Sequence, residues 1–372
     1  MQPRITAKTD KRWGFSNFHL KISATAPGKV VLLGEYSVLE GAPALSIAVD
    51  RSVRVDISPV NTRECRVFTA AVSKRPARFA IGDDGKLLWL DENGPEKFGL
   101  LKSAADALYA SGEMPALAPE NGFDILLDST ELYYDEGGHE MVKLGLGSSA
   151  ALTVALAHAL RDYSGGEPLK AGHWLPVLVQ IHRTLQAGRG SGVDIATSLY
   201  GGAIEFQLLG PNPSVHRLTL PGGLKHAFVW SGRSASTSAL LRKLSAWRDQ
   251  NTSKFINIMD QLGAASADGV AAIKAGNCAD FLASASRFGE FLDTLGCQAG
   301  LDIFSPSHRA LSALAMKSGL VYKPCGAGSG DLGVAMGTNV NDIDQFVIRA
   351  RSSGYKIIDI SPNSNGVQTI RS

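Results

Sequence analysis

A glycine-rich segment that opens directly into an apolar run constrains this chain more than any other feature. Val142–Ala150 reads Val-Lys-Leu-Gly-Leu-Gly-Ser-Ser-Ala, and the alanine-rich run Ala150–Leu160 follows. Glycine permits positive φ angles and a close backbone approach to a ligand, and Ser148 and Ser149 stand where a helix would begin. The unpaired N–H groups and positive dipole end of a helix start attract phosphate. We predict a phosphate loop that lacks the lysine of a Walker A motif, with a plain tight turn before a buried helix as the alternative.

A second segment, near the N-terminus, carries a lysine next to a predicted turn. Leu20–Ala26 alternates apolar and polar residues, as a half-buried strand does. Pro27-Gly28 predicts a turn, and Val30–Leu33 is a short apolar run. Lys29 is therefore expected between two strands, where its ammonium could point into a cleft. A solvated surface lysine is the simpler alternative.

A third segment, near the C-terminal end, is again rich in glycine. Four glycines fall within residues 326–333, between the apolar runs Gly319–Tyr322 and Leu332–Met336. This spacing predicts a loop that joins two strands. The backbone N–H groups of such a loop could form an anion-binding nest, although a tight hairpin gives the same pattern.

In this order, the three segments resemble the three motifs of the small-molecule kinases named after galactokinase, homoserine kinase, mevalonate kinase and phosphomevalonate kinase. The resemblance implies an α+β fold of two domains, with the active site in the cleft between them. It also implies that the segment around Ser148 binds the phosphates of ATP, with Mg²⁺ held by Ser148 or Ser149. The residues expected to bind ATP are Gly145, Leu146, Gly147, Ser148, Ser149 and Ala150.

Four details are more similar to the phosphomevalonate kinases than to their relatives. Tyr36 stands where mevalonate kinases and galactokinases usually show histidine. The other three are the run Ala42–Val49, residues 182–202 and residues 229–237. This resemblance implies transfer of a phosphoryl group from ATP to phosphomevalonate, which gives mevalonate diphosphate in the mevalonate route to isoprenoids.

The resemblance implies catalytic roles for Lys29 and Asp194, which would lie close together. Asp194 would accept a proton from the attacking oxygen or orient that oxygen, with a helix N-cap as the alternative. A nearby ammonium keeps a carboxylate ionised and stabilises negative charge on the transferred group. A phosphate acceptor is already mostly anionic at neutral pH, so Asp194 would act more by positioning than as a base.

The acceptor phosphate also needs cations and hydroxyl donors. Arg189 is the first candidate because a guanidinium grips phosphate with two donors, and a surface cation is the alternative. Thr237 could add a hydroxyl, Tyr36 either closes over the substrate or packs in the core, and His182 is expected to be a core histidine. The residues expected to bind substrate are Lys29, Tyr36, Arg189, Ser191, Gly192, Asp194, Ser236, Gly326, Ala327 and Gly328.

One position departs from the mevalonate kinases, which hold magnesium partly with a glutamate some eleven residues before the aspartate. Arg183 stands at this place here. The departure argues against a simple mevalonate kinase. It leaves magnesium to the nucleotide phosphates, a serine and water, or to another carboxylate. Because Mg²⁺ prefers oxygen ligands and keeps several waters, one serine with phosphates is chemically adequate.

Length and charge set outer limits. The 372 residues allow two domains of one catalytic unit, predicted as 1–208 and 209–372. A net charge of +2 with 19% charged residues argues against a nucleic-acid or membrane partner. The four scattered cysteines indicate reduced thiols in a cytoplasmic protein. The expected partner is a small phosphorylated acceptor, and the oligomeric state is open, with a homodimer as one option.

Three other functions stay open at this stage. The first is a kinase of the same family that phosphorylates an alcohol such as mevalonate or a sugar, which Tyr36 and Arg183 disfavour. The second is a ligand-binding regulator without kinase activity, which intact Lys29, Ser148 and Asp194 disfavour. The third is a related decarboxylase that uses ATP, whose usual motif around the first loop is less similar.

Overall fold

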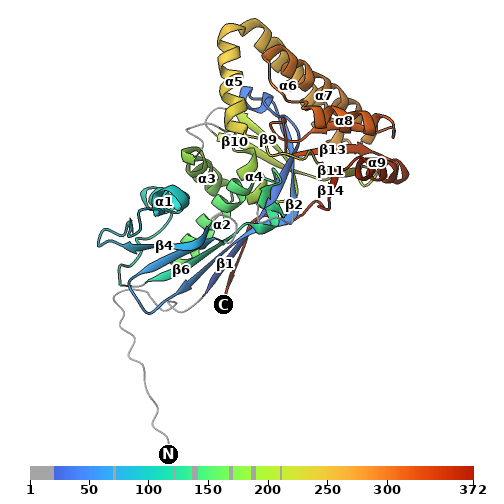
Figure 1. The fold of residues 1–372 in the computed structure, drawn as a ribbon. Helices are drawn as coiled ribbons and strands as arrows, with labels where there is room; N and C mark the ends of the chain where they lie inside the picture. The colour runs from blue at the N-terminus through green and yellow to red at the C-terminus, as the bar shows by residue number, and fades with distance from the viewer. Residues whose placement is uncertain are drawn as a thin grey trace, which may run out of the picture.

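Two β-sheets with helices against them organise the chain (Figure 1). The structure is a computed structural model that describes residues 21–69, 73–120, 122–135, 141–166, 171–185, 190–209 and 212–372. Strands and helices alternate without a regular βαβ repeat, which confirms the predicted α+β class. Within the described chain, no helix combines the length and the apolar character needed to cross a membrane.

The larger sheet has the order β10-β9-β2-β6-β3-β4-β5, with β1 beside β2 and β15 beside β1. Its pairs are antiparallel except for the parallel pair of β3 and β6. Its strands are β1 (Ile22–Leu33), β2 (Ala44–Pro59), β3 (Cys65–Thr69), β4 (Ser73–Ile81), β5 (Leu87–Trp89), β6 (Phe123–Asp128), β9 (Ala203–Leu209), β10 (Asn212–Leu218) and β15 (Gln368–Arg371).

The smaller sheet has the order β12-β13-β11-β14 and is antiparallel. Its strands are β11 (Lys225–Trp230), β12 (Val321–Pro324), β13 (Leu332–Gly337) and β14 (Lys356–Ile358). A separate hairpin of β7 (Tyr133–Asp135) and β8 (Met141–Lys143) precedes the first glycine-rich loop. The predicted loop between two strands near residue 326 is confirmed as the connection from β12 to β13.

The helices pack against both sheets, as Figure 1 shows. In the first half they are α1 (Gly94–Ala110), α2 (Ser148–Tyr163), α3 (Ala171–Leu185) and α4 (Val193–Tyr200). In the second half they are α5 (Thr237–Gln250), α6 (Thr252–Lys274), α7 (Cys278–Ala299), α8 (Pro306–Met316) and α9 (Val340–Ser352), with the short 3-10 turns η1 (Ser37–Glu40) and η2 (Thr130–Leu132) elsewhere. Helices α2 and α4 lie on β1 and β2, whereas α7, α8 and α9 contact the smaller sheet.

The predicted turn at Pro27-Gly28 is wrong, because β1 runs unbroken through it. The register with β2 shifts between Pro27 and Lys29, which marks a β-bulge or irregularity. Proline is tolerated at bulges because a ladder hydrogen bond is already interrupted there. Lys29 therefore lies inside the strand, opposite Ala48, rather than between two strands.

The sequence pattern predicts two helices at 252–262 and 265–275, whereas the structure has the single helix α6 over these residues. It is continuous to Lys274, with Gly263 and Gly269 inside it. A Cβ on Gly269 would lie 2.3 Å from Cδ1 of Leu33, so the missing side chain lets the helix pack against the end of β1. Close packing thus supports a helix that glycine propensity alone disfavours.

Two strands complicate the predicted division of the chain at residue 208. β10 pairs with β9 across that point, and β15 returns from the C-terminus to pair with β1. The larger sheet therefore contains residues from both predicted domains. The division into 1–208 and 209–372 stays a prediction about folding units.

Candidate active site

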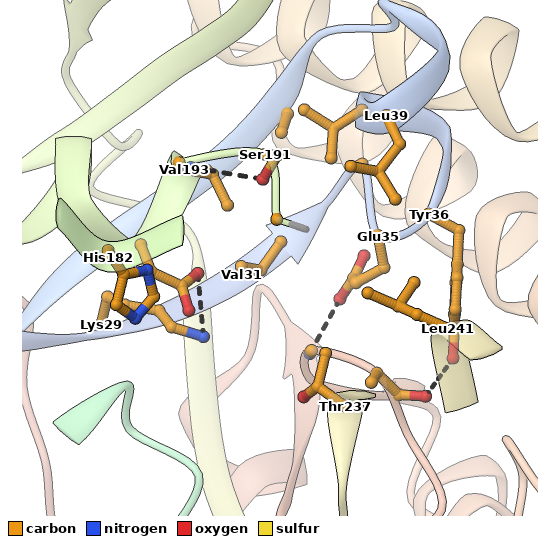
Figure 2. A pocket seen from close by; sticks show the side chains of 18 residues that line it. Lys29, Val31, Glu35, Tyr36, Leu39, His182, Ser191, Val193, Thr237 and Leu241 are labelled. Carbon is orange, nitrogen blue, oxygen red and sulfur yellow. Dashed lines mark hydrogen bonds and ion pairs between the residues drawn. The ribbon is translucent and has the colours of Figure 1, made fainter. Parts of the chain in front are cut away.

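A pocket of about 130 Å³ lies where the end of β1, the start of α4, the start of α5 and the β12–β13 loop meet. Figure 2 shows its walls: Lys29 and His182 lie on one side, and Glu35 and Tyr36 on the other. The pocket gathers residues from Lys29 to Ala327, which are 298 positions apart in the chain, so no single segment defines it. Its lining residues include Lys29, Glu35, Tyr36, His182, Gly190, Ser191, Gly192, Asp194, Thr237, Gly326 and Ala327.

One wall of the pocket holds an ion pair between Lys29 and Asp194. The Lys29 Nζ lies 3.3 Å from Oδ1 of Asp194, and the two side chains are 8% and 32% exposed. Asp194 belongs to the first turn of α4, whose N-cap is Gly192, so Asp194 is not the N-cap that sequence allowed as an alternative. Both residues line the pocket, and the Asp194 carboxylate is the more exposed partner of the pair.

The glycine-rich loop before α2 is held against Lys29 by its backbone. The Lys29 N–H donates to the carbonyl of Leu146 at 2.9 Å. Gly147 has φ 74° and is the N-cap of α2, and a Cβ there would lie 2.8 Å from Cε of Lys29. No side chain caps the first turn of α2, which suits its N–H groups to an anion. The side chains of Leu146 and Ala150 are buried in the core, so only their backbone could contact a nucleotide.

Ser149 contacts His182, which lines the pocket. The Ser149 hydroxyl and the His182 Nε2 lie 3.0 Å apart. Burial lowers the pKa of His182, which the nearby carboxylate of Asp194 opposes. His182 is buried, as predicted for a core histidine, but it also lines the pocket, which the sequence interpretation missed.

The residues present suit magnesium held mainly by phosphate and water. Among the described residues, no group of three or more His, Cys, Asp or Glu side chains could hold a metal ion. Arg183, at the position of the expected glutamate, donates from Nε to the carbonyl of Gly190 at 3.2 Å. It therefore supports the turn before α4 and cannot be a metal ligand. The hydroxyl of Ser148 or Ser149 is a ligand type that fits an ion coordinated largely by nucleotide oxygens.

The β12–β13 loop is fastened to the end of β1 by buried polar contacts. Glu35 Oε1 accepts from Nζ of Lys323 at 2.5 Å and from the N–H of Gly326 at 3.3 Å. The Tyr36 hydroxyl donates to the carbonyl of Ala327 at 2.5 Å. Burial raises the pKa of Glu35, and the Lys323 ammonium opposes that rise. Glu35 and Lys323 were not singled out from sequence, although each is a charge at the edge of an apolar run.

Two more residues missed in the sequence support the same loop from behind. Asp331 has a positive φ of 56° and accepts from the N–H of Ala235 at 3.1 Å, and burial raises its pKa to about 6. His308 is fully buried between the Tyr322 hydroxyl, 2.7 Å from Nδ1, and the Gly330 carbonyl, 2.9 Å from Nε2. Burial lowers the pKa of His308 to about 4. Because a carbonyl only accepts, the neutral ring donates from Nε2 and accepts from Tyr322 at Nδ1.

The other predicted substrate residues divide between the pocket wall and positions behind it. Ser236 caps α5 by accepting from the N–H of Ala239 at 3.4 Å, while its neighbour Thr237 lines the pocket. Gly328 packs against Ile303, where a Cβ would lie 2.7 Å away. Arg189 lies outside the described residues. The pocket brings together Lys29, Tyr36, Ser191, Gly192, Asp194, Gly326 and Ala327.

Known proteins share both this sequence pattern and this fold. The model of the GHMP kinases N terminal domain matches residues 99–202, which include the glycine-rich loop and Asp194. A phosphomevalonate kinase from Streptomyces sp. (strain CL190) is 28% identical over 370 residues, covering 92% of this chain and 97% of the relative. A mevalonate kinase from Methanothermobacter thermautotrophicus is 31% identical over 193 residues, half of each chain.

A solved structure extends the comparison to the whole fold. It is the Streptococcus pneumoniae phosphomevalonate kinase in complex with phosphomevalonate and AMPPNP, with a TM-score of 0.74 and 18% identity over 91% of this chain and 99% of that one. A kinase that phosphorylates small molecules is the class that this fold and site define. Residues 99–202 match the GHMP kinase N-terminal domain, and the chain is an ATP-dependent phosphotransferase.

Proposed function

We propose that the chain transfers a phosphoryl group from ATP to the phosphate of phosphomevalonate, which yields mevalonate diphosphate. The observation that carries this proposal is the Lys29–Asp194 ion pair inside a pocket next to the uncapped start of α2. The similarity to phosphomevalonate kinases along most of the chain supports the choice of acceptor. A cytoplasmic location is consistent with the free thiols of all four cysteines and stays part of the proposal.

The donor side of the reaction is proposed at the glycine-rich loop. Residues 145–150 would bind the ATP phosphates with the N–H groups of the first turn of α2, which favours negative charge. Bound magnesium would neutralise phosphate charge, with Ser148 or Ser149 as its protein ligand. The loop adjoins Lys29 through the Leu146 hydrogen bond, so donor phosphates and acceptor would meet at the ion pair.

The chemical step needs orientation and charge stabilisation more than it needs a strong base. The attacking phosphate oxygen is already anionic at neutral pH. The Lys29 ammonium would stabilise the negative charge of the transferred group in the transition state. Asp194 would hold Lys29 and orient the acceptor oxygen, because its carboxylate lies 3.3 Å from the ammonium and is the more exposed partner.

The acceptor would be gripped by hydroxyls and backbone groups of the pocket. Ser191 and Thr237 line it with hydroxyls, and Gly192, Gly326 and Ala327 line it with backbone. Arg189 stays our candidate for the phosphate grip, with Ser236 and Gly328 as positions that shape the wall. Arg189→Ala should raise the acceptor Michaelis constant about ten- to a hundredfold, since one charge-assisted contact contributes roughly 1.5–3 kcal/mol.

A panel of acceptors with magnesium-ATP tests the proposal. Phosphomevalonate should give the highest kcat/KM among phosphomevalonate, mevalonate, homoserine and galactose, measured by ADP release and by isolation of the diphosphate. A clear preference for mevalonate would instead support the second candidate, an alcohol-phosphorylating mevalonate kinase. The 31% identity to a mevalonate kinase over half of the chain is the observation in favour of that candidate.

Two substitutions test the proposed catalytic roles of Lys29 and Asp194. Asp194→Asn and Lys29→Met should each lower turnover by about 10²–10⁴-fold, the usual contribution of acid–base and electrostatic groups. ATP binding, measured by calorimetry, should persist in both variants because the loop at 145–149 is intact. Near-normal turnover of folded Asp194→Asn would show that Asp194 is only structural.

A further inference from the structure

A buried ion pair spans the two sheets on the far side of the pocket from Lys29. Glu35 follows β1 of the larger sheet, and Lys323 lies in β12 of the smaller sheet. Their side chains are 3% and 0% exposed, and the Nζ to Oε1 distance is 2.5 Å. Ions this deeply buried are expensive to desolvate, so a pair kept at this place calls for a role beyond general stability.

The Lys323 ammonium interacts with Glu35 and with the start of the loop that follows β12. Its Nζ also donates to the carbonyl of Pro324 at 2.7 Å and lies 5.7 Å from the ring centroid of Phe288. The ammonium therefore faces protein groups and not the pocket. It has no route to a ligand, and any influence on the reaction must pass through Glu35 and the loop.

Glu35 connects Lys323 to the pocket wall through a single carboxylate oxygen. Oε1 accepts from both Lys323 and the N–H of Gly326, while Oε2 has no hydrogen-bond partner among the described residues. Glu35, Gly326 and Ala327 all line the pocket, and Figure 2 shows the line from Glu35 to the loop. A shift of Oε1 would therefore move the loop on the acceptor side.

Tyr36 adds a second fastening directly beside the first. Its backbone has φ 64° and ψ −55°, a conformation that non-glycine residues rarely adopt. This conformation directs the hydroxyl to the carbonyl of Ala327 at 2.5 Å. A strained backbone conformation persists only where many surrounding contacts enforce it, and such conformations cluster at functional sites.

We propose that Glu35 and Lys323 are positioning residues that fix the 326–327 loop to the end of β1 and so set the geometry of the acceptor side of the pocket. The proposal rests on the proposed function only in taking this pocket as the acceptor site. Neither residue takes part in the chemical step. A displacement of about 1 Å in a reacting geometry can lower rate about 10²-fold, so the pair can matter for catalysis without contact to the reacting atoms.

The experiment separates positioning from stability by removing one charge and then both. Lys323→Met leaves Glu35 buried and unpaired, and should lower the melting temperature strongly. The double variant Glu35→Gln/Lys323→Met removes both charges and should recover most of that loss. We expect this double variant to keep a kcat/KM for the acceptor that is about 10–100-fold below the original, with the Michaelis constant for ATP changed by less than about threefold.

The matched control is Lys274→Met, which removes an ion pair between helix α6 and strand β9 of the larger sheet. Lys274 in α6 lies 2.7 Å from Glu205 of β9, and neither residue lines the pocket. This variant should lose some stability and keep both Michaelis constants. A double variant with restored stability and unchanged acceptor kinetics would overturn the proposal, as would an equal rise in both Michaelis constants.

Glu35→Gln alone keeps the test decisive if the double variant does not fold. The amide retains an oxygen that can accept from Lys323 and Gly326, so the acceptor Michaelis constant should rise only about three- to tenfold. An unchanged constant would contradict the proposal. All kinetic measurements use the acceptor of the panel that gives the highest turnover. If phosphomevalonate is not that acceptor, the proposed function fails, but the test of Glu35 and Lys323 as positioning residues can still be interpreted.

Discussion

Two glycine-rich loops lie at the site, one against Lys29 and one in the pocket wall on the other side, and they are held in place by different means. The loop at 144–147 is held by the start of α2 and by two backbone hydrogen bonds, from Leu144 to Leu132 and from Lys29 to Leu146. The loop at 325–331 is held by side chains from distant segments: Glu35, Tyr36, Arg233 and His308. A similar glycine pattern can therefore mark a loop held by backbone hydrogen bonds or one held by side chains of distant segments.

This contrast also separates the proposed tasks of the loops. A loop of backbone N–H groups at a helix start suits the triphosphate, which every kinase of this type must bind. A loop held by side chains can be tuned residue by residue, which suits the acceptor, whose identity differs between kinases. The following predictions would break or sharpen this division.

The largest expected difference comes from adding one methyl group to each loop. Gly145 and Gly326 both have positive φ, 79° and 71°, which costs alanine about 1–2 kcal/mol. A Cβ on Gly145 would also lie 2.4 Å from Cβ of Asp331, whereas a Cβ on Gly326 meets nothing within 4 Å. Overpacking adds about 1–3 kcal/mol, so Gly145→Ala should lose about 2–5 kcal/mol and Gly326→Ala only about 1–2 kcal/mol.

Urea denaturation of both alanine variants checks this order. The slope of the transition should stay constant while the midpoint falls further for Gly145→Ala. Gly145→Ala should also weaken ATP binding more than Gly326→Ala does. Equal losses of stability would contradict the close contact between the two loops at Asp331.

Acid should weaken the second loop through His308. Its pKa is about 4 in the folded protein and about 6.5 when unfolded, because burial disfavours the charged ring. The unfolded chain therefore binds more protons between these values, and stability falls as pH drops from about 6.5 to 4. The loss attributable to this residue approaches about 3 kcal/mol and levels off below pH 4.

The control for this acid effect is His308→Gln, whose amide can still donate toward the Gly330 carbonyl. Unfolding midpoints of both proteins should be compared at several pH values between 7 and 4. The stability difference between the original protein and the variant should shrink steadily over this range. A difference independent of pH would show that His308 does not resist protonation in the folded state.

The smallest expected effect comes from Tyr36→Phe. This change deletes the hydroxyl that donates to Ala327 and leaves the ring in place. One neutral hydrogen bond contributes about 0.5–1.5 kcal/mol, so the acceptor Michaelis constant should rise up to about tenfold while that for ATP stays constant. Steady-state kinetics with both substrates varied would detect this asymmetry, and an increase confined to ATP would reverse the assignment of the two loops.

Much of the local structure was predictable because it depends on short-range patterns. The sequence pattern of residues 237–250 predicts a helix, which is α5 with Ser236 as its capping residue. The start of α2 at Ser148 follows from the glycines before it. The sequence pattern does not predict the strands β3, β4, β5, β7, β8, β10 and β15 or the helix α9. β15 is exposed and only four residues long, and it exists through pairing with β1 at the other end of the chain, which no local pattern signals.

The candidate site follows the same rule. Lys29, Asp194 and the glycines of the first loop could be selected from the sequence because their residue types and spacing suit phosphate chemistry. Their meeting at 3.3 Å could not be derived, since it depends on a bulge in β1 and on where α4 begins. Glu35 and Lys323 were missed because a charged residue shows no sign of burial until its partner, 288 positions away, is placed beside it.

The residue pattern alone therefore specified which chemistry the chain carries: backbone donors at a helix start, one amine and one carboxylate. Only the tertiary structure decided which charges are buried, how the second glycine-rich loop is held, and that the wall opposite Lys29 is built from both sheets. The physical reason is the distance along the chain over which each kind of interaction acts. Turn and helix signals act within a few residues, whereas desolvation and ion pairing depend on every group that folding brings within a few ångströms.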